Sequence, residues 1–550
     1  MRQRSARKIK IVLKLALAAG TLTAMVPGPT AVRIIEFRRD LEPSPRFRER
    51  MISLGRRFAG FTVNETLSTG NIPSAAIQGF EVTAKNLRDR PIRTWSFLPG
   101  KKAVALTFRP GTYESPVAIR IRYTCPSGIC SKSLLTRKYA HPAPELAKEI
   151  PIVATGNFSV DYVMINLGIG DNTNDFASYF PAVINKHGEI VWAHLPTGGK
   201  KLFPGYWTTR DLGQGLVALM APRLHSYAEI FSLDAGVISS IDAVSKNPEI
   251  FFHHDIEAGR RADRLIYLGN ARKTLSNCRD LIAELNGKST ASGTKDPCSA
   301  TPLAVMATTI EELDFKTGAR EILWDPFKFL SFKNHPDLAA ESSFRIAPGL
   351  DLQKMLHWLP LMSVPYNQHQ SVHTDWMHGN SLNHVPGKGY LLSGKNFSRV
   401  FMISPDFKKI LWTVGPAKHD TFQVNGDAKF DSQHHVTMNG RGNLMLFDNQ
   451  TTPGGLIGTS LDRSRVIEFE LKNGKATVAW SFTPDPIISS PIRGSAYELD
   501  NGNVLSFFPE RNGAKEYILE VARPGKLVLG KITIDHRDRF LGYRALPFTI

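Results

Sequence analysis

The stretch SVHTDWMHGNSLNHVPGKGYLLSGKNFSRVFMISPDFKKILWTVG (371–415), continued by FDSQHHV (430–436) and NLMLFDNQ (443–450), decides how this chain folds. Short apolar runs at 390–393, 400–403, 410–414 and 443–447 are typical of buried β-strands. Polar residues gather at the ends of these runs; they are His378, Asn380, Lys395, His434 and His435. A rigid sheet that carries polar side chains on its loops is a common way of holding chemistry in place.

A unit that recurs from residue 158 onward predicts a repeated β-architecture. Each copy is a turn followed by β-branched or apolar residues, often closed by Trp. The six copies are KHGEIVWAH (186–194), DAGVISSID (234–242), KTGAREILWDPF (316–327), DFKKILWTVG (406–415), KNGKATVAWSF (472–482) and RPGKLVLGKI (523–532). So small a unit cannot bury its own apolar face, so the copies must stack. We expect an all-β chain in which residues 149–550 form a six-bladed β-propeller, although a β-sandwich array would have similar turns.

Upstream of the repeats, residues 60–148 are expected to form a small N-terminal β-sandwich-like domain. Runs such as GFEVTAKNL (79–87) and AVALTFRPG (103–111) alternate apolar and polar residues between turn residues. Pro142, Pro144 and Pro151 mark the boundary to the larger domain.

The N-terminus carries most of the excess positive charge. Of the formal net charge of +18, residues 1–58 contribute +10 (14 Lys and Arg against 4 Asp and Glu), which leaves +8 for the rest. Basic residues followed by the apolar run 11–26 predict a signal peptide or signal anchor over 1–32. A disordered basic tail is the alternative. Because the charge is a terminal feature, it does not indicate a nucleic-acid partner.

Residues 33–59 are expected to form a basic amphipathic helix. Its apolar stripe is Phe47, Met51, Leu54 and Phe58, with arginines around it. Such a helix either lies on an anionic membrane surface or packs on the protein body. We expect an exported protein, periplasmic or anchored to the outer face of the inner membrane. Membrane association through the N-terminus and a homodimer are both compatible with the sequence.

The chain contains four cysteines. Their even number and close pairing in an exported chain favour two disulfides, Cys125–Cys130 and Cys278–Cys298, over free buried thiols. No CxxC or Cys/His spacing of a metal site is present, and we expect no metal and no cofactor.

Several motifs occur together in a fixed order. They are FHHD (252–255), DWMHGNS (375–381), LLSGKN (391–396), QH (433–434), LFDN (446–449), SRVIEFEL (464–471) and GSAYELDNGNVL (494–505). In this order they resemble the bacterial arylsulfate sulfotransferases, which use no sulfonucleotide donor. The resemblance covers residues 150 to 550 and implies a β-propeller that moves a sulfuryl group from an aryl sulfate to a phenol. An ordered set of motifs is far more specific than any single one.

The resemblance also implies roles for individual residues. His434 matches the histidine that becomes transiently sulfated, and His378 matches a histidine that contacts the sulfuryl group. The FHHD pair supplies a third histidine, for which we favour His254 over His253. Lys395 stands where the family has arginine. Lysine keeps the positive charge but lacks the planar guanidinium group that can bind two oxygen atoms at once. The expected catalytic residues are therefore His434, His378, His254 and Lys395.

Further residues of these motifs are expected around the substrate or in supporting positions. His253, Asn380 and Trp376 are predicted to bind substrate. Asn380 is also expected to orient its loop by side-chain hydrogen bonds. For Trp376 the alternative is packing between the strands. His435 is expected to be structural, because neighbours on an extended strand point in opposite directions. Asp448 and Asn449 are expected to shape a turn.

Two other functions remain open from the sequence. A histidine-rich propeller could bind a metal or quinone and act as a dehydrogenase, although no HExxH motif or carboxylate triad supports this. A non-catalytic propeller could instead bind a sulfated ligand or a protein partner. The expected partners of the enzyme are an aryl sulfate donor and a phenolic acceptor, without nucleic acid.

Overall fold

The computed structural model describes the chain in separate ranges. They are 63–69, 71–85, 92–98, 103–108, 114–137, 150–170, 177–194, 208–213, 216–221, 227–232, 236–242, 252–261, 263–275, 303–330, 374–450, 463–510, 515–535 and 542–548. The predicted signal or anchor (1–32), the amphipathic helix (33–59) and the Cys278–Cys298 pair lie outside these ranges. Within them, no helix has the length and apolar character needed to cross a membrane.

Strands form nearly all the regular structure of the described ranges. The helical elements there are one four-residue α-helix, α7 (Pro326–Phe329), and short 3-10 turns. Asp325 caps α7 by accepting a hydrogen bond from the Phe327 N–H. The prediction of an all-β chain is confirmed.

The N-terminal part contains two three-stranded sheets, which together span much of the range predicted as a β-sandwich. Their strand orders are β1 (Val63–Ser68), β4 (Ala103–Phe108) and β3 (Ile92–Leu98) in one, and β2 (Ile77–Lys85), β5 (Glu114–Cys125) and β6 (Gly128–Arg137) in the other. Phe80 of β2 meets Trp95 of β3 edge to face at 5.3 Å, which brings the two sheets into contact.

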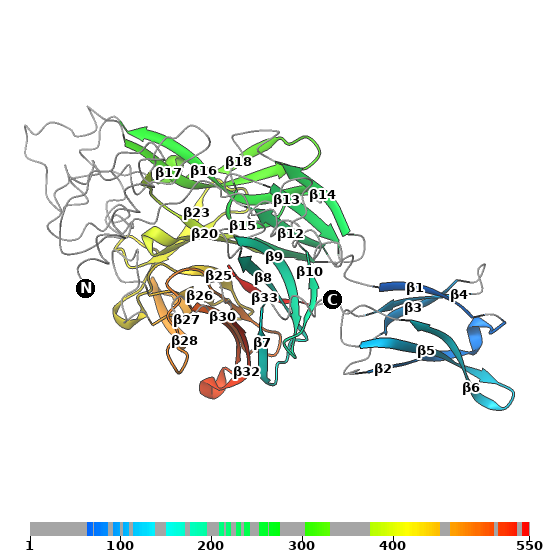
Figure 1. The fold of residues 1–550 in the computed structure, drawn as a ribbon. Coiled ribbons are helices and arrows are strands. Elements are labelled where there is room, and N and C mark those ends of the chain that lie inside the picture. The colour runs from blue at the N-terminus through cyan, green and yellow to red at the C-terminus, as the bar shows by residue number, and fades with distance from the viewer. Residues whose placement is uncertain are drawn as a thin grey trace, which may run out of the picture. The chain divides into compact units, whose positions relative to one another are not determined.

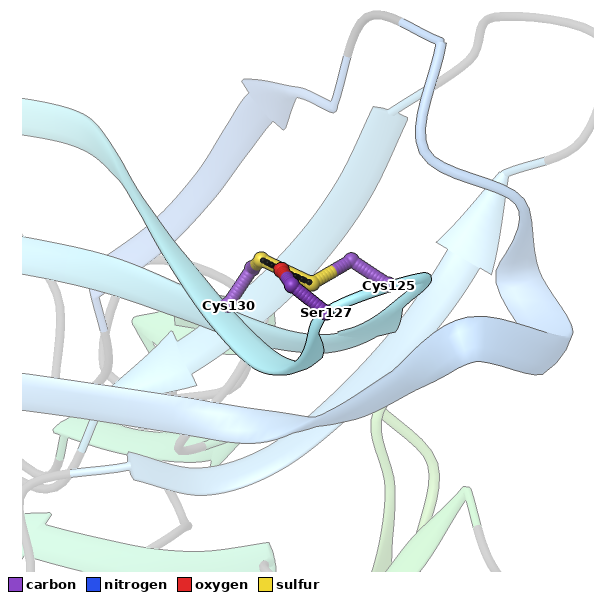
Figure 2. Close-up of a disulfide and its surroundings, with 3 residues drawn as sticks. All are labelled: Cys125, Ser127 and Cys130. Atoms are coloured by element: carbon purple, nitrogen blue, oxygen red, sulfur yellow. Dashed lines mark hydrogen bonds between the residues drawn. A yellow bond between two sulfur atoms is a disulfide. The ribbon is translucent and has the colours of Figure 1, made fainter.

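A disulfide joins the ends of β5 and β6. Cys125 and Cys130 are bonded across the tight turn, with Ser127 beside both sulfur atoms (Figure 2). This confirms the first predicted disulfide. The bond closes a hairpin whose strands are already paired, so its loop is short and the entropy it removes from the unfolded chain is modest.

In the part of the chain that the structure describes after residue 150, the strands form six successive antiparallel groups of four (Figure 1). The strands of each group, in their order across the sheet, have the following bounds. The first group contains β33 (Ala545–Phe548), β8 (Tyr162–Gly170), β9 (Ala177–Asn185) and β10 (Ile190–Ala193), and the second β11 (Thr208–Gly213), β12 (Leu216–Ala221), β13 (Tyr227–Ser232) and β14 (Gly236–Asp242). The third contains β15 (His253–Ala258), β16 (Arg264–Leu275), β17 (Leu303–Asp314) and β18 (Arg320–Trp324), and the fourth β20 (Gly379–Val385), β21 (Gly389–Gly394), β22 (Arg399–Ile403) and β23 (Ile410–Gly415). The fifth contains β25 (His434–Met438), β26 (Leu444–Asp448), β27 (Arg465–Lys472) and β28 (Lys475–Phe482), and the sixth β29 (Ser495–Glu498), β30 (Val504–Glu510), β31 (Lys515–Val521) and β32 (Val528–Asp535).

Three further strands add to these groups. The two-residue β24 (Phe422–Gln423) joins the fourth and fifth groups into one nine-stranded sheet, and β19 (Thr374–Asp375) pairs with β17. Strand β7 (Ile152–Gly156) adds to the outer edge of the sixth group, while β33 completes the first. Each end of this region is therefore paired with strands from the other end of the sequence.

Six apolar clusters lie between successive groups of strands. One joins the fourth and fifth groups through Val400, Leu446 and Ile467, and another joins the sixth to the first through Phe507 and Phe180. The other four fill the remaining junctions. Burying one such side chain stabilises the fold by about 1.5–3 kcal/mol.

The repeat noted in the sequence corresponds to one strand in each group. The six copies supply β10, β14, β18, β23, β28 and β32, the last strand of every group. The first strands are in contact from one group to the next, from β11 through β15, β20, β25 and β29 to β33, and β8 contacts β11. Residues at the starts of these first strands therefore come close together although they are far apart in sequence.

Candidate active site

Two adjacent histidines at the start of β15 lie with their rings against each other. The ring centroids of His253 and His254 are 4.0 Å apart. Neighbouring side chains on a regular strand point to opposite faces. Here, however, the pairing with β16 shifts register between His253 and Ile256, and His254 has φ of 52°. This β-bulge turns both imidazoles toward the same region.

His378 joins this pair from the segment that leads into β20. Its ring centroid lies 5.2 Å from that of His253 and 4.7 Å from that of His254. His378 has φ of 49°, and the following Gly379 N–H donates to Thr308 Oγ1 at 2.7 Å. A Cβ at Gly379 would lie 2.6 Å from the Thr308 side chain, so only glycine lets the backbone pass here.

His434, the first residue of β25, is buried and held through its Nδ1 atom. Nδ1 lies 2.8 Å from Asn449 Oδ1 and 3.2 Å from the carbonyl oxygen of Ser432. The Asn449 amide nitrogen donates to the carbonyls of Ser490 and Arg493 at 2.6 and 2.8 Å. These two carbonyls can only accept, so they orient the amide with its oxygen toward His434. Nδ1 therefore carries the proton, and Nε2 carries the lone pair.

The surroundings of His434 keep its ring neutral. Burial lowers the pKa of His434 well below its ordinary value, and the positive charge of Lys395 lowers that pKa further. Lys395 is half-buried at the start of the 3-10 turn η4 (Lys395–Phe397), directly after β21. A neutral imidazole beside a cation is a nucleophile in a site that favours negative charge.

The C-terminal segment contributes two residues to the same region. The Tyr543 ring lies 5.6 Å from His254 and 6.2 Å from His434, and its hydroxyl donates to the carbonyl oxygen of Asn380 at 2.7 Å. Burial raises the pKa of the Tyr543 phenol, so this hydroxyl keeps its proton at neutral pH. The pairing of β33 with β8 holds this segment in place.

A buried ion pair below the histidines ties three elements together. Arg544 donates to both carboxylate oxygens of Asp255 at 3.1 and 3.0 Å, and Asp255 also accepts from the Leu382 N–H at 2.8 Å. Asp255 follows His254 directly, so the pair anchors β15 against β20 and the C-terminal segment. A bidentate pair with low exposure has the geometry that makes such contacts strong.

The structure brings the predicted histidines and Lys395 together but corrects the prediction for Trp376. This side chain is 2% exposed and is stacked on Phe327, with Phe397 packed edge-on against it. It belongs to the core between the third and fourth groups. Its indole is therefore not available to bind a substrate, because aromatic packing on both sides occupies its surface.

Asn380 and His435 have supporting positions. The fully buried Asn380 donates through Nδ2 to the carbonyl of Gln433 at 2.8 Å, so it links β20 to the residue that precedes β25. The prediction that Asn380 contacts substrate does not agree with this burial, whereas the predicted orienting role does. His435 accepts a hydrogen bond on Nδ1 from the Ala496 N–H at 3.2 Å and packs against Tyr497. The expected structural placement of His435 agrees with these contacts.

Three residues of this region were missed from the sequence. Asn449 was expected to shape a turn, yet it orients His434 from the position that directly follows β26. Asp448, which was also expected to shape that turn, is the last residue of β26 and forms an ion pair with Arg465. Tyr543 and Arg544 lie outside every motif. The LFDN motif could have indicated the role of Asn449. A side-chain amide that directly follows a buried strand is well placed to form hydrogen bonds with residues at the end of the neighbouring strand. The C-terminal pair had no local signal.

Comparison with known proteins finds one family model that matches part of the chain. The family model described as arylsulfotransferase (ASST) matches residues 358–532, so this part of the chain is similar to the arylsulfotransferases. The matched range contains His378, Lys395, His434 and Asn449, whereas the His253–His254 pair and Tyr543 lie outside it.

No curated protein matches the sequence. Among solved structures, the tricorn protease matches with 10% identity and a TM-score of 0.26, over 77% of this chain. The chain spans 34% of the length of that protein.

Proposed function

We propose that this protein transfers a sulfuryl group from an aryl sulfate ester to a phenol through a sulfated His434. The observation that carries the proposal is the state of His434, whose Nε2 lone pair is left available while Asn449 holds the Nδ1 proton. The family match supports aryl sulfotransferase chemistry in general. A sulfuryl group carries negative charge on three oxygens, and Lys395 supplies a positive charge close to His434.

The first half of the reaction transfers the group to the protein. The Nε2 lone pair of His434 attacks sulfur, the bond between sulfur and the aryl oxygen breaks, and the electron pair leaves with the phenolate. We assign His254, when protonated, as the acid that gives this phenolate a proton. His378 and Lys395 contact the sulfuryl oxygens, whose charge they offset.

The second half restores the enzyme. The acceptor phenol passes its proton to the now neutral His254, and its oxygen attacks sulfur as the N–S bond to His434 breaks. The products are a new aryl sulfate and the free imidazole, so no nucleotide and no oxidant is consumed. Such a cycle gives ping-pong kinetics.

We further propose that the six groups of strands are the blades of a β-propeller with this site at its centre. Two observations support this architecture: each apolar cluster lies between successive groups, and the first strands contact each other in sequence order back to the first group. Residues from separate blades converge at the middle of a propeller, and this arrangement would account for the proximity of His254, His378 and His434.

We propose that the protein is exported, either periplasmic or held at the outer face of the inner membrane. The basic residues and apolar run at the N-terminus support this location. The Cys125–Cys130 disulfide also supports it, because such bonds persist in oxidising compartments.

A chromogenic donor tests the reaction. With nitrophenyl sulfate and no nucleotide, release of nitrophenol is expected to rise with the concentration of added phenol, and reciprocal plots at several donor concentrations should be parallel. Protein that binds aryl sulfates without turning over any of a broad donor panel would instead be a non-catalytic binding module.

Asn449 provides a test of how the nucleophile is oriented. Asn449→Ala removes the acceptor that holds the Nδ1 proton, so turnover is expected to fall on the order of a hundredfold or more, as when the orienting group of a catalytic histidine is changed. Asn449→Asp keeps an acceptor but adds negative charge, which raises the pKa of His434.

The sign of the accompanying pH effect follows from the nucleophile. Only neutral His434 attacks, so activity is lost as pH falls through the His434 pKa. Because burial and then Lys395 depress this pKa below 6.5, the acid limb set by His434 should lie below pH 6.5 in the wild type and move to higher pH in Asn449→Asp. Profiles of kcat/KM against pH measure the shift, and an unchanged acid limb in that variant would contradict the assigned contact.

A further inference from the structure

Three imidazoles form a compact cluster that the transfer reaction does not fully use. One ring nitrogen from each of His253, His254 and His378 can be chosen so that all three atoms lie within 4.8 Å of one another. His253 is 5% exposed, while the other two are partly exposed. The cluster is therefore largely enclosed, while two of its three rings remain partly exposed.

The backbone holds this cluster in place. His254 and His378 have φ of 52° and 49°, a region that residues with a Cβ occupy only when their surroundings hold them there. The bulge in β15 supplies two adjacent ligand candidates, and Gly379 fixes the approach of the third. Convergence of three donors from two separate elements is the arrangement expected of a preformed site.

We propose that His253, His254 and His378 bind a divalent first-row transition-metal ion, such as Zn²⁺ or Co²⁺, with the remaining coordination positions open to water or to an anion. Neutral imidazole nitrogen is a favoured ligand of these ions, and three protein ligands with an open position are a common arrangement. Nitrogens around a tetrahedral zinc ion lie about 3.4 Å apart, given Zn–N bonds of about 2.1 Å. Rotation of the side chains would bring the three rings together by the ångström or so required.

The surrounding charges set the character of the site. Asp255 is engaged by Arg544, so its charge is already offset, and no carboxylate belongs to the three-residue cluster. The charge of Lys395, which acts on His434, also disfavours a cation nearby. The ion is therefore exchangeable, and it occupies imidazoles that the proposed function assigns to the sulfuryl group and the leaving phenolate. On that proposed function, the ion inhibits transfer in competition with the donor.

Binding is tested directly on the full chain without a polyhistidine tag. Titration with Co²⁺, followed by visible absorption, and with Zn²⁺, followed by calorimetry, is expected to reveal one ion per protein. His253→Gln and His378→Gln should each weaken binding at least tenfold, and their folding is checked by circular dichroism and thermal unfolding. His187→Ala, at an exposed histidine outside the cluster, is the matched control and should bind like the wild type. Absence of a stoichiometric ion, or equal binding by the wild type and a folded His253→Gln, overturns the proposal.

A second variant separates this site from the proposed function. Lys395→Ala removes a cation from the region, so metal binding should be retained or tightened while sulfuryl transfer falls on the order of a hundredfold or more. A protein that binds Co²⁺ through these histidines but transfers no sulfuryl group would contradict the proposed function alone. A protein that transfers the group but binds no ion would contradict the metal site alone.

Discussion

His434→Ala is expected to abolish sulfuryl transfer, with a fall in kcat on the order of 10⁴-fold or more, as when a catalytic nucleophile is removed. The physical reason is that Nε2 of this residue carries the lone pair that receives the group, while Asn449 holds the opposite nitrogen. Turnover of a chromogenic aryl sulfate measures the loss. The variant should keep its fold, because the apolar clusters between the groups of strands do not include His434.

The covalent intermediate gives the same prediction a direct readout. Incubation of the wild type with an aryl sulfate and no acceptor should add one SO₃ group to a peptide that contains Gln433, His434 and His435. Fragmentation should place the group on His434, and the adduct should be labile to acid because an N–S bond joins it to imidazole. A label on His378 or His254 would assign the nucleophile elsewhere.

His435 is the internal control for this experiment. Its Nδ1 accepts from the Ala496 N–H, and burial lowers the pKa of His435 well below its ordinary value, so the ring is a neutral part of the interior. His435→Ala leaves that N–H without its acceptor and should cost about 1–3 kcal/mol of stability. It should nevertheless retain substantial turnover per folded molecule, and loss of turnover equal to that of His434→Ala would contradict the assignment.

Lys395→Ala is expected to lower kcat/KM on the order of a hundredfold or more, comparable to the loss of one group that stabilises charge in a transition state. The ammonium group acts on His434 at close enough range to depress its pKa, so it is near the position where the sulfuryl oxygens develop charge. Lys395→Arg should retain activity or increase it, since a guanidinium can hold two oxygens at once.

Two further measurements decide the role of Lys395. Lys408→Ala, at an exposed lysine of the turn between β22 and β23, is the matched control and should leave the kinetics unchanged. In Lys395→Ala the pKa of His434 should rise, because a positive charge that opposes protonation has been removed. Unchanged kinetics in Lys395→Ala would remove this residue from the site.

The all-β class and the strands of the central stretch could be predicted because both depend on local patterns. The apolar runs at 390–393, 400–403 and 410–414 lie in β21, β22 and β23, and each copy of the repeated unit supplies the last strand of a group. Period and turn residues are local properties, so they can be read along the chain. His378, Lys395 and His434 were singled out differently, through the resemblance that their ordered motifs bear to a known family, and their catalytic roles stay predictions.

Other features could not be predicted because they arise from contacts between distant segments. Alternation along a regular strand implies that His253 and His254 face opposite ways, yet the bulge in β15 turns both rings to one side. For Trp376 the sequence left both substrate contact and packing open, and its stacking on Phe327 places it in the core. Neither bulges nor core partners are marked by local sequence.

By itself, the sequence determined the strand-forming pattern, the repeated turn and the motif residues to which we assign the proposed chemistry. Only the tertiary structure decided which of them meet. Pairing of β33 with β8 brings Tyr543 and Arg544 to a site whose other residues lie far earlier in the chain. Asn449 becomes the partner of His434 because β25 and β26 are paired. Proximity of this kind depends on how strands pair and stack, a property of the whole folded chain that no short stretch of sequence contains.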